Sequence, residues 1–122
     1  MNDGRAHARL CAEIKREVSQ IVEFEARDPI LRDAIPTVMA VKLSVDARYA
    51  KVYVALAQGT REEKLEVMAA FRRDRGFFRT ELARRLSLRY TPQLEFILDE
   101  TVERAIRFEQ ILSREDDELG LV

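Results

Sequence analysis

Residues 39–56, with the sequence MAVKLSVDARYAKVYVAL, alternate apolar and polar side chains in two runs. A period of two places successive side chains on opposite faces of a β-strand. The apolar positions are Met39, Val41, Leu43 and Val45 in the first run and Ala50, Val52, Val54 and Leu56 in the second. Because only Asp46, Ala47 and Arg48 separate the runs, the segment predicts an antiparallel hairpin with one buried face.

Helical spacing of apolar residues precedes the hairpin. Residues 5–26 carry apolar side chains at three- and four-residue steps, which predicts an amphipathic helix. The apolar positions are Leu10, Ile14, Val18, Ile21 and Val22. The pair Asp28-Pro29 is expected to end this helix, because the residue before a proline is displaced from the α region. A loop is expected from there to Pro36.

Two further helices are predicted after the hairpin, over residues 61–74 and 77–86, with Gly76 between them as a kink. Thr60 has the side chain of a good N-cap for the first of these helices. The side chains expected to point inward are Leu65, Met68 and Ala69 in the first helix and Phe78, Leu82 and Leu86 in the second.

A strand and a last helix are predicted to follow. The strand rests on the alternation of Leu94, Phe96 and Leu98 with the side chains between them. The last helix is predicted for residues 100–113, and its inward side chains are expected to be Val102, Ala105, Ile106 and Leu112.

The predicted order α-β-β-α-α-β-α favours a two-layer α+β domain. The chain has 122 residues, a length typical of one domain. We therefore expect a single domain over residues 1–122, with an ordered core at 5–113 and a flexible acidic tail at 114–122.

Residue types that carry catalysis or metal binding are sparse. Cys11 is the only cysteine, His7 is the only histidine, and no glycine-rich phosphate loop occurs. No catalytic residue, metal or cofactor is predicted, so we expect a protein that is not an enzyme; a hydrolase would need a base that the sequence does not supply. Residues 116–118 would hold a divalent cation only loosely, and a solvated acidic tail is the simpler interpretation.

The sequence carries no signal for a membrane. No apolar run approaches the ~20 residues that span a bilayer, and residues 1–5 lack the apolar stretch of a leader peptide. We expect a soluble, cytoplasmic monomer.

Positive charge is concentrated in residues 72–89, although the whole chain has a formal charge of −1. In this stretch seven arginines face only Asp74 and Glu81, a net charge of +5. The arginines are Arg72, Arg73, Arg75, Arg79, Arg84, Arg85 and Arg89. A field of one sign attracts a polyanion whatever the total charge of the protein. A solvated arginine face paired with distant glutamates remains the plainer alternative.

A helix kink at Gly76 would expose the start of the second predicted helix beside these arginines. The start of the second helix offers unpaired N–H groups and the positive end of a dipole, which together favour a phosphate. Arginine side chains add bidentate phosphate contacts. The residues predicted to bind such an anion are Arg72, Arg73, Arg75, Gly76, Arg79, Arg84, Arg85 and Arg89, with Arg48 and Lys51 as secondary contacts. Of the neighbours Phe77 and Phe78, one is expected in the core and one partly exposed.

Several of these segments resemble one known family. They are SVDARYAKVYV at residues 44–54, RGFFRTEL at 75–82, LSLRYTP at 86–92, LEFILDE at 94–100 and the early RDP at 27–29. Together they are similar to ribosome-binding factor A, in the same order along the chain and over about residues 5–112.

The resemblance implies a type II KH-like fold. In that family an Ala-x-Gly motif at an interhelical kink replaces the usual Gly-x-x-Gly loop. The motif falls here on Asp74-Arg75-Gly76, so an aspartate stands where the family has alanine. This aspartate would serve as an N-cap of the following helix.

The resemblance also implies a function. The family binds 16S rRNA on the immature small (30S) ribosomal subunit, and assists its late maturation and rRNA processing, including cold adaptation. The alternative from a different class is a protein–protein interaction module that uses the sheet face or the acidic tail.

Overall fold

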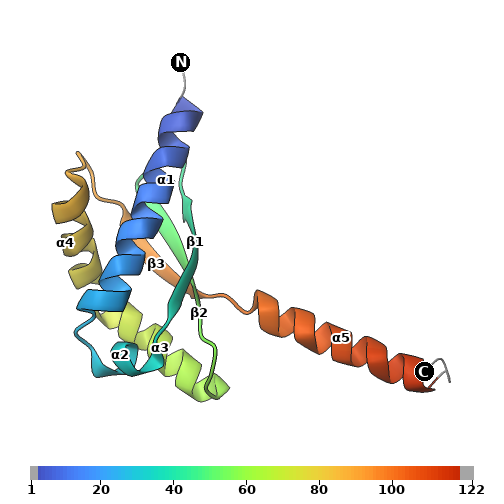
Figure 1. Cartoon of the computed structure of the whole chain (residues 1–122). Coiled ribbons are helices and arrows are strands. Elements are labelled where there is room, and N and C mark those ends of the chain that lie inside the picture. Colours follow the sequence, from blue (N-terminus) through green and yellow to red (C-terminus); the bar gives the residue numbers. More distant parts are fainter. Residues whose placement is uncertain (1–2, 119–122) are drawn as a thin grey trace.

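The computed structural model describes residues 3–118 as one sheet with its covering helices and one projecting helix (Figure 1). The elements are α1 (Asp3–Gln20), the π-helix η1 (Ile21–Glu25), α2 (Pro29–Ala34), β1 (Thr37–Leu43), β2 (Tyr49–Ala55), α3 (Arg61–Arg73), α4 (Arg75–Leu86), β3 (Gln93–Leu98) and α5 (Thr101–Glu118). The predicted two-layer α+β architecture is confirmed. Every predicted helix and strand is present, and one helix is added.

The three-stranded sheet has the order β1-β2-β3. The hairpin β1–β2 is antiparallel, as predicted, whereas β2 and β3 are parallel. A parallel pair needs a crossover long enough to return the chain to the same end of the sheet. The helices α3 and α4 form that crossover, so the arginine-rich segment lies across one face of the sheet (Figure 1).

The predicted cap of α3 is confirmed by reciprocal hydrogen bonds. The Thr60 Oγ1 accepts from the Glu63 N–H at 3.1 Å, and the Glu63 carboxylate accepts from the Thr60 N–H at 3.2 Å. This capping box satisfies two donors that the helix itself leaves unpaired.

The hairpin departs from strict alternation at both ends of its first strand. Val38 rather than Met39 points into the core, because the pairing with β2 shifts between Val38 and Ala40. Such a bulge adds one residue and moves the following side chains to the other face. Met39 is therefore 41% exposed. Val45, predicted to face inward, lies beyond the end of the strand and is 98% exposed.

The predicted loop before Pro36 contains a short helix, α2, so that prediction was wrong. The Asp28 side chain accepts a hydrogen bond from the Ile30 N–H at 2.9 Å, and Pro29 occupies the first helical turn. An aspartate cap followed by proline is a strong helix start. The pair that ends the first helix thus also begins the next.

The break between α3 and α4 falls at Asp74 and not at Gly76. Asp74 has φ −93° and ψ 9°, outside either helix, and Gly76 lies in the first turn of α4. A Cβ placed on Gly76 would meet no atom within 4 Å. The Asp74 side chain makes no capping hydrogen bond to α4, contrary to expectation. Because Gly76 lies within helix α4 and its surroundings are open, neither a left-handed backbone nor close packing requires a glycine at this position.

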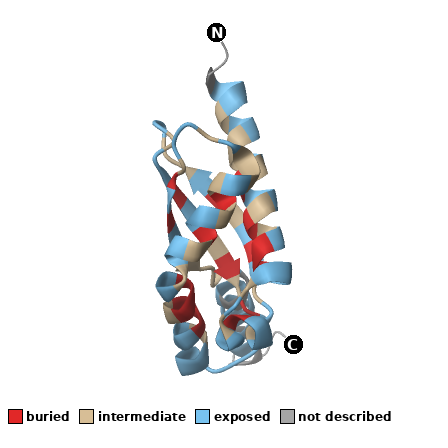
Figure 2. Ribbon diagram, turned by 90° about the vertical axis from the view of Figure 1, so that its left-hand side faces the viewer, coloured by how far each residue is buried: buried red, intermediate tan, exposed pale blue. Residues whose placement is uncertain are grey.

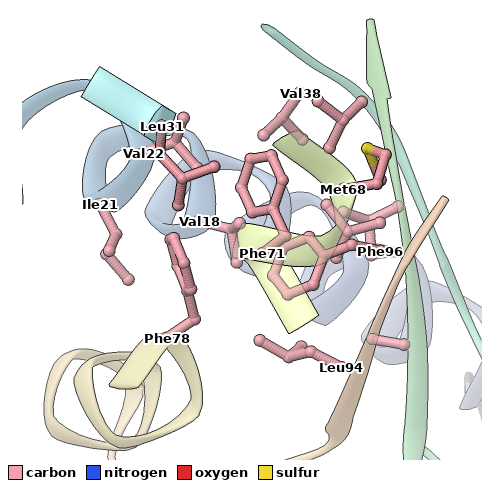
Figure 3. Close-up of a cluster of buried hydrophobic side chains, with 14 of the residues drawn as sticks. Val18, Ile21, Val22, Leu31, Val38, Met68, Phe71, Phe78, Leu94 and Phe96 are labelled. Carbon is pink, nitrogen blue, oxygen red and sulfur yellow. The ribbon is translucent and has the colours of Figure 1, made fainter. Parts of the chain in front are cut away.

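The core is built around three aromatic rings from three elements. The rings of Phe71 and Phe96 stack at 4.7 Å between centroids, and Phe78 lies 5.7 Å from Phe71 and 5.3 Å from Phe96. Side chains of α1, η1 and α2 close over them (Figure 3). Buried residues accordingly lie on the inner sides of the helices and the sheet (Figure 2). Leu65 was wrongly predicted to face inward and is 48% exposed, because the buried face of α3 is formed by Val67, Met68, Ala70 and Phe71.

The helix α5 projects away from the rest of the molecule (Figure 1). The expected inward side chains Ile106 and Leu112 are 52% and 44% exposed, and Ala105 is exposed too, so the predicted packing of this helix was wrong. The Val102 side chain is outside the described part of the structure. The helix also continues beyond residue 113 to Glu118, through half of the predicted tail. The remainder of that tail, residues 119–122, is outside the described residues.

Candidate nucleic-acid interface

The predicted arginines extend from the last turn of α3 along α4 to the segment that follows it. Arg72 and Arg73 occupy the last turn of α3, and Arg75 is the first residue of α4. Arg79, Arg84 and Arg85 lie along α4, and Arg89 follows it. Since a helix rises about 1.5 Å per residue, the twelve residues of α4 separate the two ends of this arginine surface by about 18 Å.

Arg85 has a structural position. Its guanidinium contacts the Glu17 carboxylate of α1 at 3.1 Å and the Glu25 carboxylate of η1 at 2.5 Å. Its side chain is only 22% exposed, and the hydrogen bond to Glu17 is the main cause that raises the pKa of Arg85. This arginine joins α4 to the first helix of the chain.

Three other arginines also have partners, but they are more exposed. Arg73 pairs with the Asp28 carboxylate at 3.2 Å, and Arg84 pairs with Glu81 at 2.7 Å. Arg79 donates from Nη2 and Nε to the Thr91 carbonyl oxygen at 2.9 and 3.2 Å. A carbonyl leaves the charge of Arg79 uncompensated, so its attraction for anions remains.

Arg72, Arg75 and Arg89 are exposed and, among the described residues, have no ion pair or side-chain hydrogen bond. Arg72 and Arg75 flank the helix break, where the first N–H groups of α4 lack partners within their own helix. Two exposed guanidinium groups without an ion pair thus lie on either side of the helix break, where the sequence predicted phosphate binding.

The secondary residues Arg48 and Lys51 occupy different places. Lys51 projects from the outer face of the sheet, because its neighbours Ala50 and Val52 face the helices. The fold therefore separates Lys51 from the surface of α3 and α4. Arg48 lies in the hairpin turn, where its backbone oxygen accepts from the Gln93 N–H at 2.8 Å. This contact brings Arg48 next to the segment that contains Arg89.

Two aromatic side chains beside the helix break behave as predicted. Phe78 is fully buried, and Phe77 is half-buried with the Arg27 guanidinium 4.1 Å from its ring centroid. One of the neighbouring pair therefore packs in the core and the other at its edge. Tyr53, on the outer face of the sheet, lies under the Lys42 ammonium at 5.3 Å.

The lone histidine and cysteine link α1 to the hairpin. The His7 Nε2 lies 2.8 Å from the Ser44 carbonyl oxygen, and the Cys11 thiol donates to the Val41 carbonyl oxygen at 2.9 Å. Sequence periodicity carried no signal for either contact. Within the side chains that the structure describes, no three His, Cys, Asp or Glu residues converge on a metal site. The side chains of residues 116–118, the weak metal candidate, are outside that set.

The antiparallel hairpin, the parallel third strand and the broken helix pair between them define a KH-like α+β domain. The family model for ribosome-binding factor A matches residues 6–112, and the chain belongs to that family. The ribosome-binding factor A of Acetivibrio thermocellus is 40% identical over 105 residues, covering 86% of this chain and 84% of the relative.

Solved structures agree with this assignment. The crystal structure of ribosome-binding factor A from Thermus thermophilus is 33% identical, covers 75% of this chain and 93% of its own, and superposes with a TM-score of 0.64. A homology model of the Thermus thermophilus ribosome-binding factor A, fitted into the cryo-EM map of a 30S–RbfA complex, is 30% identical, with a TM-score of 0.62 over 76% of this chain and 94% of the other. No helix in the described part of this chain is long and apolar enough to span a membrane.

Proposed function

We propose that this chain is a non-catalytic assembly factor that binds the 16S rRNA of the immature 30S subunit in the cytoplasm. In this role it assists late maturation and rRNA processing, including growth in the cold, and acts as a monomer. The observation that carries the proposal is the uncompensated pair Arg72, in the last turn of α3, and Arg75, the first residue of α4. The related Thermus thermophilus protein in a 30S complex supports the same target.

The arginine surface divides into contacts of unequal weight. Arg72, Arg75 and Arg89 bind phosphates at the lowest cost, because they give up only water and no ion pair within the described residues. Arg79 keeps its charge while it bonds Thr91, and Arg73 and Arg84 exchange an exposed ion pair for a phosphate. Arg85 contributes by holding α4 in place. Gly76 permits close approach of an RNA backbone, since its surroundings are open.

The test is association with purified small subunits over a range of salt concentrations. Neutralising about four to six phosphates gives a slope of log affinity against log salt of about −3 to −5. The double variant Arg72→Glu/Arg75→Glu should weaken binding more than tenfold, reduce the slope by about 2 and keep the thermal midpoint. Lys15→Glu/Arg16→Glu, an equal charge change on exposed residues of α1, is the matched control and should bind as the parent does.

Crosslinking in cells with sequencing of the bound RNA tests the target, and the crosslinks should cluster on 16S rRNA. Salt-independent association, absence of binding to small subunits, or full binding by the Arg72→Glu/Arg75→Glu variant would contradict the proposal.

A protein-interaction module is the second candidate, and α5 favours it. This helix exposes Ile106, Phe108, Ile111 and Leu112, which are 52%, 61%, 48% and 44% accessible. Exposed apolar side chains on a projecting helix are typical of a protein contact. Retention of subunit binding after Arg72→Glu/Arg75→Glu, with loss of binding after removal of α5, would favour this function.

A further inference from the structure

Three segments that are distant in the sequence meet at one end of the molecule. They are the first turns of α1, the hairpin turn, and the segment between α4 and β3. The His7 ring contacts the Ser44 carbonyl oxygen at 2.8 Å, and the Gln93 N–H donates to the Arg48 carbonyl oxygen at 2.8 Å. These contacts hold the hairpin turn beside Tyr90, whose ring centroid lies 5.6 Å from the Arg48 guanidinium carbon.

Tyr90 is exposed in a way that core packing does not explain. Its side chain is 65% accessible, whereas tyrosine in folded domains is intermediate in burial. Arg48 lies over the ring within the range of a cation–π contact, which leaves much of the aromatic surface in water. The backbone that carries the ring is held by the Gln93 hydrogen bond. The ring is therefore presented on an ordered support.

The charge around Tyr90 suits an anionic ligand. Arg89 is exposed and has no ion pair among the described residues, and Arg48 is exposed. The nearby acid Asp46 is engaged within the hairpin turn, where its carboxylate accepts from the Ser44 hydroxyl at 2.7 Å and the Arg48 N–H at 3.1 Å. These hydrogen bonds, that from Ser44 first, lower the pKa of Asp46. The acid thus stabilises the turn that carries Arg48.

We propose that Tyr90, with Arg48 and Arg89, is a stacking site for an unpaired base of single-stranded RNA. The proposal rests on the RNA-binding function above and adds the kind of RNA that is bound. An exposed aromatic ring beside arginines binds an unstacked base by its face, while the guanidinium groups contact the flanking phosphates. A base within a duplex is already stacked on both sides, so the site selects single strands.

The site lies at the opposite end of α4 from Arg72 and Arg75. About 18 Å of helix separates the two positions. One end of α4 then binds the phosphate backbone, and the other end binds a base in an adjacent unpaired segment.

The experiment compares Tyr90→Ala, Tyr90→Phe and the exposed-aromatic control Phe24→Ala in binding to purified small subunits. Phe24 is 75% exposed and lies between Glu23 and Glu25. Tyr90→Ala should weaken binding about tenfold without changing the salt slope, because stacking releases no counterions. Tyr90→Phe and Phe24→Ala should stay within about twofold of the parent, since both keep the aromatic face of residue 90.

A direct readout uses tyrosine fluorescence, because the chain has three tyrosines and no tryptophan. Single-stranded r(A)10 should quench the emission of the full chain, a ten-base-pair RNA duplex should quench it much less, and Tyr90→Ala should remove the difference.

Subunit binding by Tyr90→Ala equal to that of the parent would overturn the stacking site and leave the arginine surface standing. Loss of subunit binding without any quenching by r(A)10 would also overturn it and would assign Tyr90 to a protein contact. If r(A)10 quenches the tyrosine emission of the parent chain but the chain does not bind small subunits, the stacking site stands and the proposed target fails.

Discussion

Single aromatic residues determine how firmly the helix pair is attached to the sheet. Phe71 on α3, Phe78 on α4 and Phe96 on β3 are at most 1% exposed and contact one another ring to ring. Aromatic pairs in this geometry add to the free energy of burial. The sequence predicted Phe78 in the core but not Phe71, because the inward side of α3 was assigned to Leu65, Met68 and Ala69, whereas Val67, Met68, Ala70 and Phe71 form it.

Truncation of Phe78 tests this cluster. Phe78→Ala should lower the free energy of unfolding by about 3–5 kcal/mol, the usual cost of removing a buried phenyl ring and leaving a cavity. Urea denaturation followed by circular dichroism measures it. The matched control, Phe24→Ala, removes a ring that is 75% exposed and should change the free energy by less than about 0.5 kcal/mol. Equal effects of the two substitutions would contradict the core described here.

At the scale of elements, the predictions that succeeded rest on local signals. The capping box at Thr60 is contained within four residues, and the alternation in β2 continues through the whole strand. The missed helix α2 also starts at a local signal, the Asp28 cap followed by Pro29, whereas two other failures involve neighbouring elements. The bulge in β1 arises from its pairing with β2, and the break between α3 and α4 falls at Asp74. Gly76 attracted the prediction because glycine is the usual residue at a kink, although the backbone there is helical.

The attachment of α4 to α1 gives an element-scale prediction. Arg85→Ala should reduce the free energy of unfolding by about 1–2 kcal/mol, because it leaves Glu17 and Glu25 without their shared cation. Arg84→Ala removes an exposed ion pair to Glu81 and should cost less than about 0.5 kcal/mol. Urea denaturation at low salt measures both. Arg85 would belong to the RNA contacts instead if its substitution weakened subunit binding while stability stayed unchanged.

At the scale of the whole molecule, the position of α5 sets it apart from the core. Its described side chains from Arg104 to Arg114 are exposed, and its connection to the domain includes the ion pair of Arg61 with Glu100. The amphipathic pattern of this helix predicted a buried face. A pattern of this kind shows that a helix has an apolar side, but not whether the same chain supplies a surface to cover it.

Removal of α5 is therefore expected to leave the domain folded. A chain that ends at Glu100, so that the ion pair with Arg61 is kept, should unfold cooperatively in urea with a free energy within about 1 kcal/mol of the full chain. The matched comparison is a chain that ends at Ala57 and lacks α3, α4 and β3. This chain should not fold, because it loses all three core rings, which belong to Phe71, Phe78 and Phe96. A loss of more than about 2 kcal/mol on removing α5 would show that this helix packs on the core.

The sequence by itself determined the α+β class, the hairpin, the helix pair, the cap at Thr60 and the concentration of arginine in residues 72–89, because each of these is a local or compositional property. Only the tertiary structure decided which arginines remain uncompensated. Arg85 finds Glu17, 68 positions away, whereas Arg72 and Arg75 find no partner among the described residues. The same holds for the meeting of Arg48 with Tyr90. Ion pairs and ring contacts depend on distances in space, and those distances exist only after the crossover helices have packed on the sheet.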